Sequence, residues 1–255
     1  MNKNSFKTQF AIVALVIGLL PGMHNSIFAQ TAPPGTVSSA KTKSSSVTYI
    51  SVPHDEFDID IFSKESGETG DFAGAVQRCA DKKQQLVFAM NGAKCDRNLK
   101  PLGLLIKGLT KYKDFVRPDN NVFTSIGQSA VFAIDRNNIA NIIPAKNFKE
   151  ANDLANYQLA VQSGTMLINK AFLNRDIIKV AEKQMFNGIG IKQNGDIVLA
   201  VTNEKMNLRE FALFFEEMNC RDAMLLDAGA NCQWYAPGKP KNPGKPGQIL
   251  VVTKK

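Results

Sequence analysis

The sequence is poor in histidine, the residue on which many metal sites and nucleophilic active sites depend. It has two histidines among 255 residues, and His24 lies in an N-terminal segment that we expect to be removed. His54 then remains, and no second histidine, cysteine or carboxylate accompanies it at the spacing of a metal site or a nucleophile–base pair. We therefore expect no metal ion, and we expect His54 to lie on the surface beside Pro53.

Several motifs that bind phosphate groups or activate a nucleophile are also missing. The chain has no Gly-x-Ser-x-Gly turn and no Gly-x-x-x-x-Gly-Lys loop, and residues 187–195 do not fit the dinucleotide fingerprint. We find neither an internal repeat nor a nucleic-acid-binding signature. A hydrophobic content of 44% excludes a disordered chain. The sequence therefore predicts a folded protein without an organic cofactor or a nucleic-acid partner.

The N-terminus has the organisation of an export signal. Lys3 and Lys7 provide positive charge, and residues 10–20 form an apolar run of 11 residues that ends at Pro21. This run is shorter than the roughly 20 residues of a membrane span. We expect residues 1–30 to be a cleaved signal peptide, with an uncleaved anchor as the alternative. The mature protein is then periplasmic or secreted, with no stable membrane span.

Removal of the signal peptide also lowers the net charge. The chain has 31 basic and 23 acidic residues, and the loss of two lysines leaves 29 − 23 = +6. This excess suits an anionic ligand, although part of it lies in the loop-like segment 237–247. Residues 31–46 are rich in small and polar residues and are predicted to form a flexible leader. Residues 47–255 are then one domain, whose oligomeric state the sequence does not indicate.

All four cysteines lie in the exported part of the chain. An even number of cysteines in an oxidising compartment permits two disulfides, and no pair has Cys-x-x-Cys spacing. Cys79 and Cys95 would form one bridge, and Cys220 and Cys232 the other. Buried free thiols are the alternative.

Hydrophobic patterns predict more strands than helices. Alternating residues at 47–53 and 57–62 indicate an opening hairpin or meander, and residues 156–170 indicate a pair of strands broken at Ser163-Gly164. Asn194-Gly195 predicts a hairpin over 187–204. Further strands are expected at 85–92, 102–108, 129–138 and 223–226. The fold class that follows is α+β, with a large, mixed, twisted β-sheet and packed helices in a single domain.

Two segments have helical spacing. Residues 72–84 place their apolar side chains on one face, and residues 207–219 form the clearest helix. Asn207 is positioned to cap the second helix, and Glu210 lies three residues later as in a capping box.

Four predicted strands end on clusters of polar and small residues, at 89–95, 160–166, 186–190 and 225–231. Small residues allow a backbone to approach a ligand closely. If these ends converge, their polar side chains line one pocket; the alternative is that each satisfies its own backbone. The polar residues concerned are Asn91, Gln162, Ser163, Asn187 and Asp227.

The order of these clusters resembles the phosphodiester glycosidase domain family, and in particular its bacterial branch. The resemblance covers residues 47–252. Its five motifs are Asn91-Gly92-Ala93-Lys94-Cys95, Pro101-Leu102-Gly103-Leu104, Gln162-Ser163-Gly164-Thr165-Met166-Leu167, Phe186-Asn187-Gly188-Ile189-Gly190 and Leu226-Asp227-Ala228-Gly229-Ala230-Asn231.

This resemblance implies hydrolysis of a sugar-1-phosphodiester, or of a related glycan linkage, at the anomeric carbon. A phosphate monoester leaves readily, so one carboxylate suffices where most glycosidases use two. The resemblance makes Asp227 the catalytic residue. It assigns substrate binding to Asn91, Gly92, Gln162, Ser163, Gly164, Asn187, Gly188 and Gly229.

The chain also departs from the family pattern. Phe186 stands where the family has an arginine suited to phosphate, and Ala93 and Ala228 replace glycines; an alanine with positive φ costs about 1–2 kcal/mol. Lys94, Arg97 and Lys183 are the cations that would replace the arginine. We expect weak activity on family substrates, with Phe186 as a main reason. Two alternatives follow: a catalytically degenerate member that binds carbohydrate or anionic glycan without turnover, and a structural protein of the envelope.

Overall fold

A computed structural model provides the structure of the protein. It describes residues 32–117, 129–149, 154–175, 177, 181–230, 232–239 and 245–255. The predicted signal peptide and Asn231 lie outside the described residues. Within the described ranges, no helix is long and apolar enough to cross a membrane.

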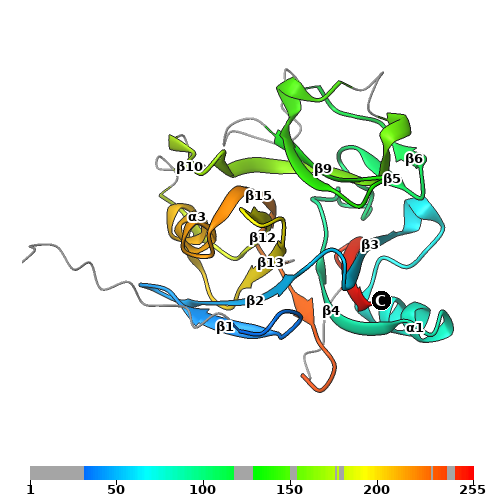
Figure 1. Cartoon of the computed structure of the whole chain (residues 1–255), viewed down its shortest axis with the longest axis horizontal. Coiled ribbons are helices and arrows are strands. Elements are labelled where there is room, and N and C mark those ends of the chain that lie inside the picture. The colour runs from blue at the N-terminus through cyan, green and yellow to red at the C-terminus, as the bar shows by residue number, and fades with distance from the viewer. Residues whose placement is uncertain are drawn as a thin grey trace, which may run out of the picture.

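Among the residues that the structure describes, the larger of the two main sheets has eleven strands, most of which are labelled in Figure 1. Its strands follow the order β1-β2-β13-β12-β15-β9-β5-β6, with β7 and β10 also paired to β9 and β8 paired to β7. They are β1 (Ser38–Lys41), β2 (Ser46–Val52), β5 (Leu105–Lys107), β6 (Thr110–Lys113), β7 (Ser129–Asp135), β8 (Ala140–Pro144), β9 (Tyr157–Asn169), β10 (Phe172–Leu173), β12 (Phe186–Lys192), β13 (Ile197–Thr202) and β15 (Cys220–Ala228).

Within the described ranges, the smaller main sheet has four strands in the order β16-β4-β17-β3, and β11 pairs with β14 separately. Their bounds are β3 (Phe57–Ser63), β4 (Gln85–Asn91), β11 (Lys183–Gln184), β14 (Met206–Asn207), β16 (Trp234–Tyr235) and β17 (Gln248–Lys254). The helices are α1 (Phe72–Asp81) and α3 (Leu208–Glu217), with short 3₁₀ helices η1 (Lys64–Ser66), η3 (Ala145–Asn147) and η4 (Leu154–Asn156).

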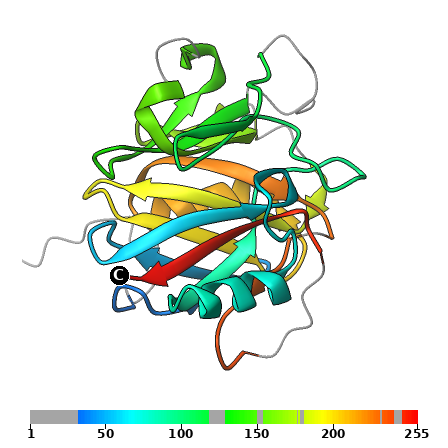
Figure 2. The same cartoon turned by 90° about the vertical axis from the view of Figure 1, so that its right-hand side faces the viewer.

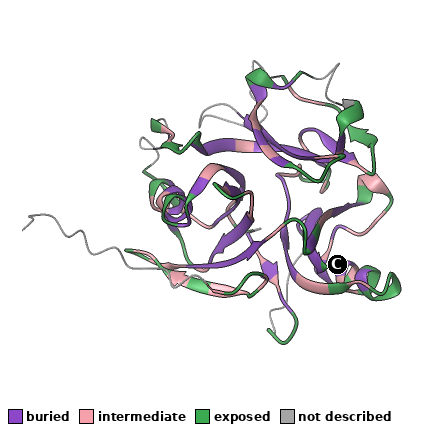
Figure 3. Ribbon diagram, in the orientation of Figure 1, coloured by how far each residue is buried: buried purple, intermediate pink, exposed green. Residues whose placement is uncertain are grey.

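The main hydrophobic core lies between the two sheets. Ile189 of β12 and Met224 of β15 contribute to this core from the large sheet, and Phe88 of β4 and Leu250 of β17 contribute from the small sheet. Helix α3 covers the outer face of the large sheet, and helix α1 covers the outer face of the small sheet. The two helices therefore lie on opposite sides of the molecule, as Figures 1 and 2 show. Figure 3 shows the buried residues concentrated in the strands, with exposed residues mainly in loops and on outer helix surfaces.

The fold class is α+β, as predicted, but the pairing of the strands differs from the expectation of a mixed sheet. All pairings recorded among the described strands of the two main sheets are antiparallel. Parallel neighbours need a long crossover connection, whereas β7–β8 and β12–β13 are joined directly as hairpins.

The chain start also differs from the prediction. Strands β2 and β3 are not a hairpin, because β2 pairs with β1 and β13 whereas β3 pairs with β17. Both strands have one face in the shared core between the sheets, and alternation alone does not identify a strand's partner. The predicted flexible leader, residues 31–46, contains the edge strand β1.

Residues 156–170 contain one long strand instead of two. Strand β9 continues through Ser163 and Gly164, and its register against β7 shifts at this point, so that Ser129 opposes Thr165 and Ala130 opposes Ser163. Gly164 is the extra residue of a β-bulge. The small residue that suggested a turn therefore marks a bulge inside a strand.

Both predicted helices are confirmed. The Asp71 carboxylate accepts a hydrogen bond from Gly74 N at 2.8 Å and caps α1, and Asn207 Oδ1 accepts one from Arg209 N at 2.9 Å and caps α3. Glu210 does not close a capping box. Its carboxylate instead accepts hydrogen bonds from Ser44 N at 2.7 Å and Ser44 Oγ at 2.6 Å, which ties the β1–β2 turn to α3.

All four cysteines are free thiols in this structure, three of them buried and Cys95 half-buried. The two bridges considered from the sequence are therefore not formed, and the thiols pack as small apolar side chains. His54 is exposed, as predicted.

Candidate functional site

Three of the predicted polar residues converge where strands of both sheets end. Asn91 is the last residue of β4 in the small sheet. Asn187 and Asp227 lie opposite each other on β12 and β15 of the large sheet. The Asn187 side chain crosses between the sheets, because its Nδ2 donates a hydrogen bond to Asn91 O at 2.5 Å.

A β-bulge aims Asp227 into this space. Met224 faces the core between the sheets and Leu225 faces α3, so strict alternation would turn residue 227 toward α3. The register between β12 and β15 shifts between Asn187 and Gly188, so that no residue of β12 lies opposite Leu226. One extra residue reverses the alternation, and Asp227 therefore points to the same side as Asn187.

The carboxylate of Asp227 has two hydrogen-bond donors. Ala228 N donates to Oδ1 at 2.8 Å, and Asn91 Nδ2 donates to Oδ2 at a long 3.5 Å. Asn91 is itself fixed, because its Oδ1 accepts from Gln233 N at 3.0 Å. Gln233 was not singled out from the sequence, since it contributes through its backbone, which no residue-type pattern reports.

Burial controls the ionisation of Asp227. The residue is 8% exposed. Burial raises the pKa of Asp227 from 3.8 to about 6, against the opposing effects of the Ala228 N–H and the positive charge of Lys94. A carboxyl group with this pKa exchanges its proton near neutral pH, which suits a general acid or base.

Lys94 is the lysine whose charge reaches this carboxylate. Its backbone is fixed beside β15: Lys94 N donates to Ser163 Oγ at 3.0 Å, and Ser163 Oγ donates to Leu226 O. Lys94 O accepts from Leu102 N at 3.1 Å. Lys94 is half-buried, and its ammonium group forms no ion pair within 4 Å to any residue that the structure describes. It is therefore available to an anion.

Two neighbouring thiols also border the site. Burial, together with the negative charge of Asp227, raises the pKa of Cys95 to about 12 and raises the pKa of Cys232 as well. Cys232 Sγ lies 3.8 Å from Asn187 Oδ1. Both thiols therefore stay protonated and act as neutral packing groups beside the carboxylate.

Gln162 does not join the site, in contrast to the expectation. Its Oε1 accepts from Leu104 N at 3.3 Å and Val116 N at 2.8 Å, and its Nε2 donates to Val116 O at 2.6 Å and Ser129 Oγ at 3.2 Å. These four bonds use the full capacity of an amide side chain. Gln162 therefore anchors the segment that precedes residue 117. Ser163 likewise has a positioning role, because its hydroxyl holds Lys94 and Leu226.

The glycines at the site have two different functions. An added Cβ would lie 3.0 Å from Gln248 Cβ at Gly92, 2.9 Å from Leu225 O at Gly164, and 2.8 Å from Met224 O at Gly188. These three glycines therefore allow close packing within the protein. Gly229 is different: it has φ +98°, and an added Cβ would meet no atom of the described residues within 4 Å. Gly229 therefore serves the backbone conformation two residues after Asp227, and not close packing.

Phe186 points away from Asp227. It pairs with Ala228 on the face of the large sheet that α3 covers, is 2% exposed, and stacks on Phe211 with ring centroids 5.7 Å apart. An arginine at this position would enter an aromatic cluster, so the structure gives no support for Phe186 as the cause of weak activity. Ala93 and Ala228 are not among the residues with positive φ, and they carry no left-handed strain.

The chain belongs to the phosphodiester glycosidase family, whose model matches residues 84–252. This match confirms the resemblance seen in the motifs. The chain is similar to YigE of Escherichia coli K12, with 29% identity over 181 residues that make up 69% of this chain and 68% of YigE.

Two solved structures share the fold. The catalytic domain of zebrafish N-acetylglucosamine-1-phosphodiester α-N-acetylglucosaminidase, auto-inhibited by its pro-peptide, matches with a TM-score of 0.57 and 17% identity over 86% of this chain and 82% of that one. A hypothetical protein from Synechocystis matches with a TM-score of 0.56 and 12% identity over 86% of this chain and 61% of that one. At these identities the likeness concerns the fold alone.

Proposed function

We propose that this protein hydrolyses the bond between a sugar and the phosphate of a sugar-1-phosphodiester, with Asp227 as the catalytic carboxylate. The observation that carries this proposal is the buried carboxylate of Asp227, whose pKa burial raises to about 6, together with the charge of Lys94, which acts on this carboxylate and forms no ion pair with a described residue. Family membership supplies the reaction class.

In the proposed reaction, Asp227 acts as a general base. Above pH 6 its carboxylate is mostly ionised and accepts a proton from water as the water oxygen bonds to the anomeric carbon. The bond between the anomeric carbon and the phosphate oxygen breaks, and its electron pair leaves with the phosphate monoester. The proton on Asp227 then passes to solvent. The leaving group needs no protonation, which explains how a single carboxylate suffices.

Lys94 and Asn91 have separate parts in this scheme. The ammonium of Lys94 pairs with the phosphate, whose negative charge increases as the bond breaks. This gives the chain a phosphate-binding cation without an arginine at position 186. Asn91 orients Asp227 through its Nδ2 hydrogen bond of 3.5 Å, which is long enough to shorten when a ligand orders the site.

A second candidate function is binding without turnover. Two observations favour it: Asp227 is only 8% exposed, and all hydrogen-bonding positions of the Gln162 amide are occupied within the protein. Fewer groups are therefore available to a substrate than the motifs predict. In this alternative the site holds a carbohydrate or anionic glycan. In both cases we propose that the protein acts after export, in the periplasm or outside the cell, as the N-terminal pattern suggests.

The test is a panel of sugar-1-phosphodiesters assayed for release of the free sugar. We expect the wild type to release sugar and Asp227→Asn to be inactive. Asp222→Asn is the matched control. Asp222 lies on the same strand as Asp227, but its Oδ1 accepts a hydrogen bond from Lys170 N at 2.9 Å, outside the site. Saturable binding of the panel by the wild type without any product would support the second function. Equal activity of the two variants would refute the role of Asp227.

A further inference from the structure

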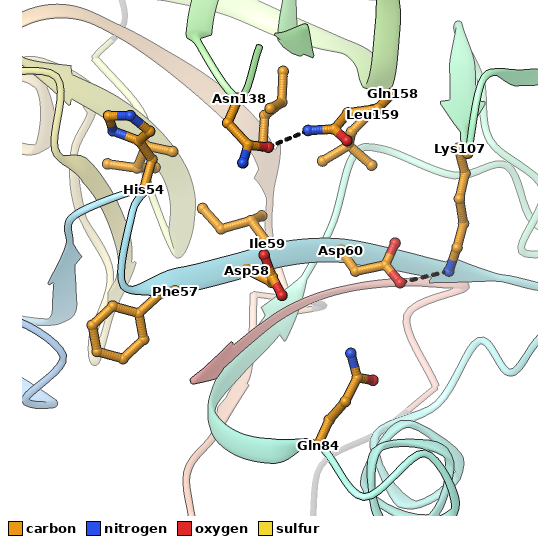
Figure 4. Close-up of a pocket in the computed structure, with 13 residues that line it drawn as sticks. His54, Phe57, Asp58, Ile59, Asp60, Gln84, Lys107, Asn138, Gln158 and Leu159 are labelled. Carbon is orange, nitrogen blue, oxygen red and sulfur yellow. Dashed lines mark hydrogen bonds and ion pairs between the residues drawn. The ribbon is translucent and has the colours of Figure 1, made fainter. Parts of the chain in front are cut away.

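A cavity of about 300 Å³ lies beside the edge strand β3, and none of the residues of the Asp227 site lines it (Figure 4). It lies toward the opposite end of the strands that form the catalytic site. Gln84 lines the cavity just before β4 begins, whereas Asn91 ends that strand. A strand of seven residues spans roughly 20 Å. The cavity is therefore a separate site, and its volume is at the lower end of the range for small-ligand pockets.

The cation in this cavity is already neutralised. Lys107 Nζ lies 2.9 Å from Asp60 Oδ2, forms an ion pair with the Glu68 carboxylate at 2.5 Å, and donates to Ile61 O at 2.9 Å. The ion pair of Lys107 and Asp60 is visible in Figure 4. Asp58 adds a negative charge to the rim, with Lys255 Nζ 3.8 Å away. The described residues that line the cavity thus offer no unpaired cation to a phosphate or carboxylate, in contrast to Lys94.

Neutral hydrogen-bonding groups around the cavity remain available. Asn138 Oδ1 accepts from Gln158 Nε2, which orients both side chains at the rim. Asn138 Nδ2 and both amide atoms of Gln84 have no hydrogen-bond partner among the residues that the structure describes. The rim therefore presents amide donors and acceptors together, the combination that hydroxyl groups require because each hydroxyl both donates and accepts.

The backbone of β3 adds a further pair of groups. As the edge of the small sheet, β3 pairs only with β17. Ile61 directs its N–H and C=O outward, where Asp60 Oδ1 and Lys107 Nζ bind them at 2.7 and 2.9 Å. The two-residue period directs the N–H and C=O of Ile59 to the same side. Next to them, Phe57, Leu159 and Ile197 provide an apolar wall.

These constraints favour a compact ligand over a peptide strand. A peptide that extended β3 would need successive outward backbone groups, but those of Ile61 are occupied and Phe57 N bonds to Pro53 O at 3.3 Å. The outward N–H and C=O of Ile59 have no partner among the described residues. This donor and acceptor suit a ring with hydroxyl groups on its edge and C–H groups on its face. We propose that this cavity binds an uncharged pyranose sugar, independently of the Asp227 site.

The experiment is an NMR titration of ¹⁵N-labelled full-length protein with methyl α-D-glucopyranoside, methyl α-D-galactopyranoside and methyl N-acetyl-β-D-glucosaminide. Glucose-1-phosphate and trialanine are the charged and peptide comparisons. We expect at least one methyl glycoside to saturate with a millimolar Kd, and to shift the amide signals of Ile59 and Gly108. Asp227→Asn should bind this sugar equally well, which separates this site from the proposed activity.

Two variants test the contacts. Asn138→Gly removes the amide without strain, because residue 138 has φ 63°, and Gln84→Ala removes the second amide. Each should weaken binding about fivefold to tenfold, the effect of one lost hydrogen bond. Gln193→Ala, on the exposed β12–β13 turn, is the matched control and should bind as the wild type. The proposal is overturned if no glycoside saturates, if neither variant weakens binding, if the shifts centre on Gly229, or if trialanine or glucose-1-phosphate shifts the amide signals of Ile59 and Gly108 at a lower concentration than the glycoside does.

Discussion

The variant Lys94→Met tests the proposed phosphate contact. It removes the positive charge that lowers the pKa of Asp227, and it keeps a side chain of similar length. The backbone contacts of residue 94 to Ser163 Oγ and Leu102 N involve main-chain atoms, so the variant should fold. Two consequences follow. The phosphate loses its pairing cation, and the pKa of Asp227 rises above 6, because Lys94 normally lowers it.

The expected magnitude comes from the charge that develops on the leaving phosphate. A group that stabilises such charge typically contributes about 10²–10³ in rate. We therefore expect kcat/KM for a sugar-1-phosphodiester to fall by about this factor in Lys94→Met. The fall should be much smaller for a nitrophenyl glycoside of the same sugar, whose leaving group carries no phosphate. Such a split between substrates identifies a phosphate contact and not a general loss of structure.

Arg97→Met is the matched control. Arg97 is exposed and lies three residues from Lys94, so the variant loses the same net charge without altering the site. It should retain activity on both substrates, and the pH profile of Lys94→Met should shift upward while that of Arg97→Met does not. Equal losses on the phosphodiester and the nitrophenyl glycoside, or equal losses in the two variants, would refute the role of Lys94.

Three further predictions follow from the site. The folded-state pKa of Asp227 is about 6 and exceeds the ordinary 3.8, so the native state loses stability as pH rises from 4 to 6. At pH 7.5, Asp227→Asn should therefore be more stable than the wild type by up to about 3 kcal/mol in urea unfolding. An unchanged or lower urea midpoint would contradict this. Activity of the wild type should rise as pH increases through about 6, whereas a rate that falls over this range would exclude a general base. Phe186→Arg should lower the free energy of unfolding by more than about 3 kcal/mol, because it buries an unpaired charge beside Phe211, and any gain in turnover would show that position 186 reaches the substrate.

Local patterns predicted the elements of the fold better than their partners. Apolar periodicity located α1 and α3, and Asn194-Gly195 located the β12–β13 hairpin. The same alternation was present in β2 and β3, yet it did not place them in different sheets, because alternation reports burial of one face and not the neighbour along the edge.

The candidate site was predicted in part for a related reason. Asn91, Asn187 and Asp227 converge as expected, since each lies at the end of a buried strand or one residue from it. Gln162 faces elsewhere because successive residues of β9 point to opposite sides, and Ser163 takes the side of the site. The bulge at Leu226, which turns Asp227 toward the site, depends on the pairing of β12 with β15 and is invisible in either strand alone.

The central claim is that water attacks the anomeric carbon of a sugar-1-phosphodiester in a reaction that depends on Asp227. The most direct measurement is hydrolysis in ¹⁸O-labelled water, followed by mass spectrometry of both products. The account predicts that the label enters the sugar and is absent from the phosphate monoester, and that Asp227→Asn releases neither product. Label in the phosphate would mean that the P–O bond breaks instead, and it would contradict the account.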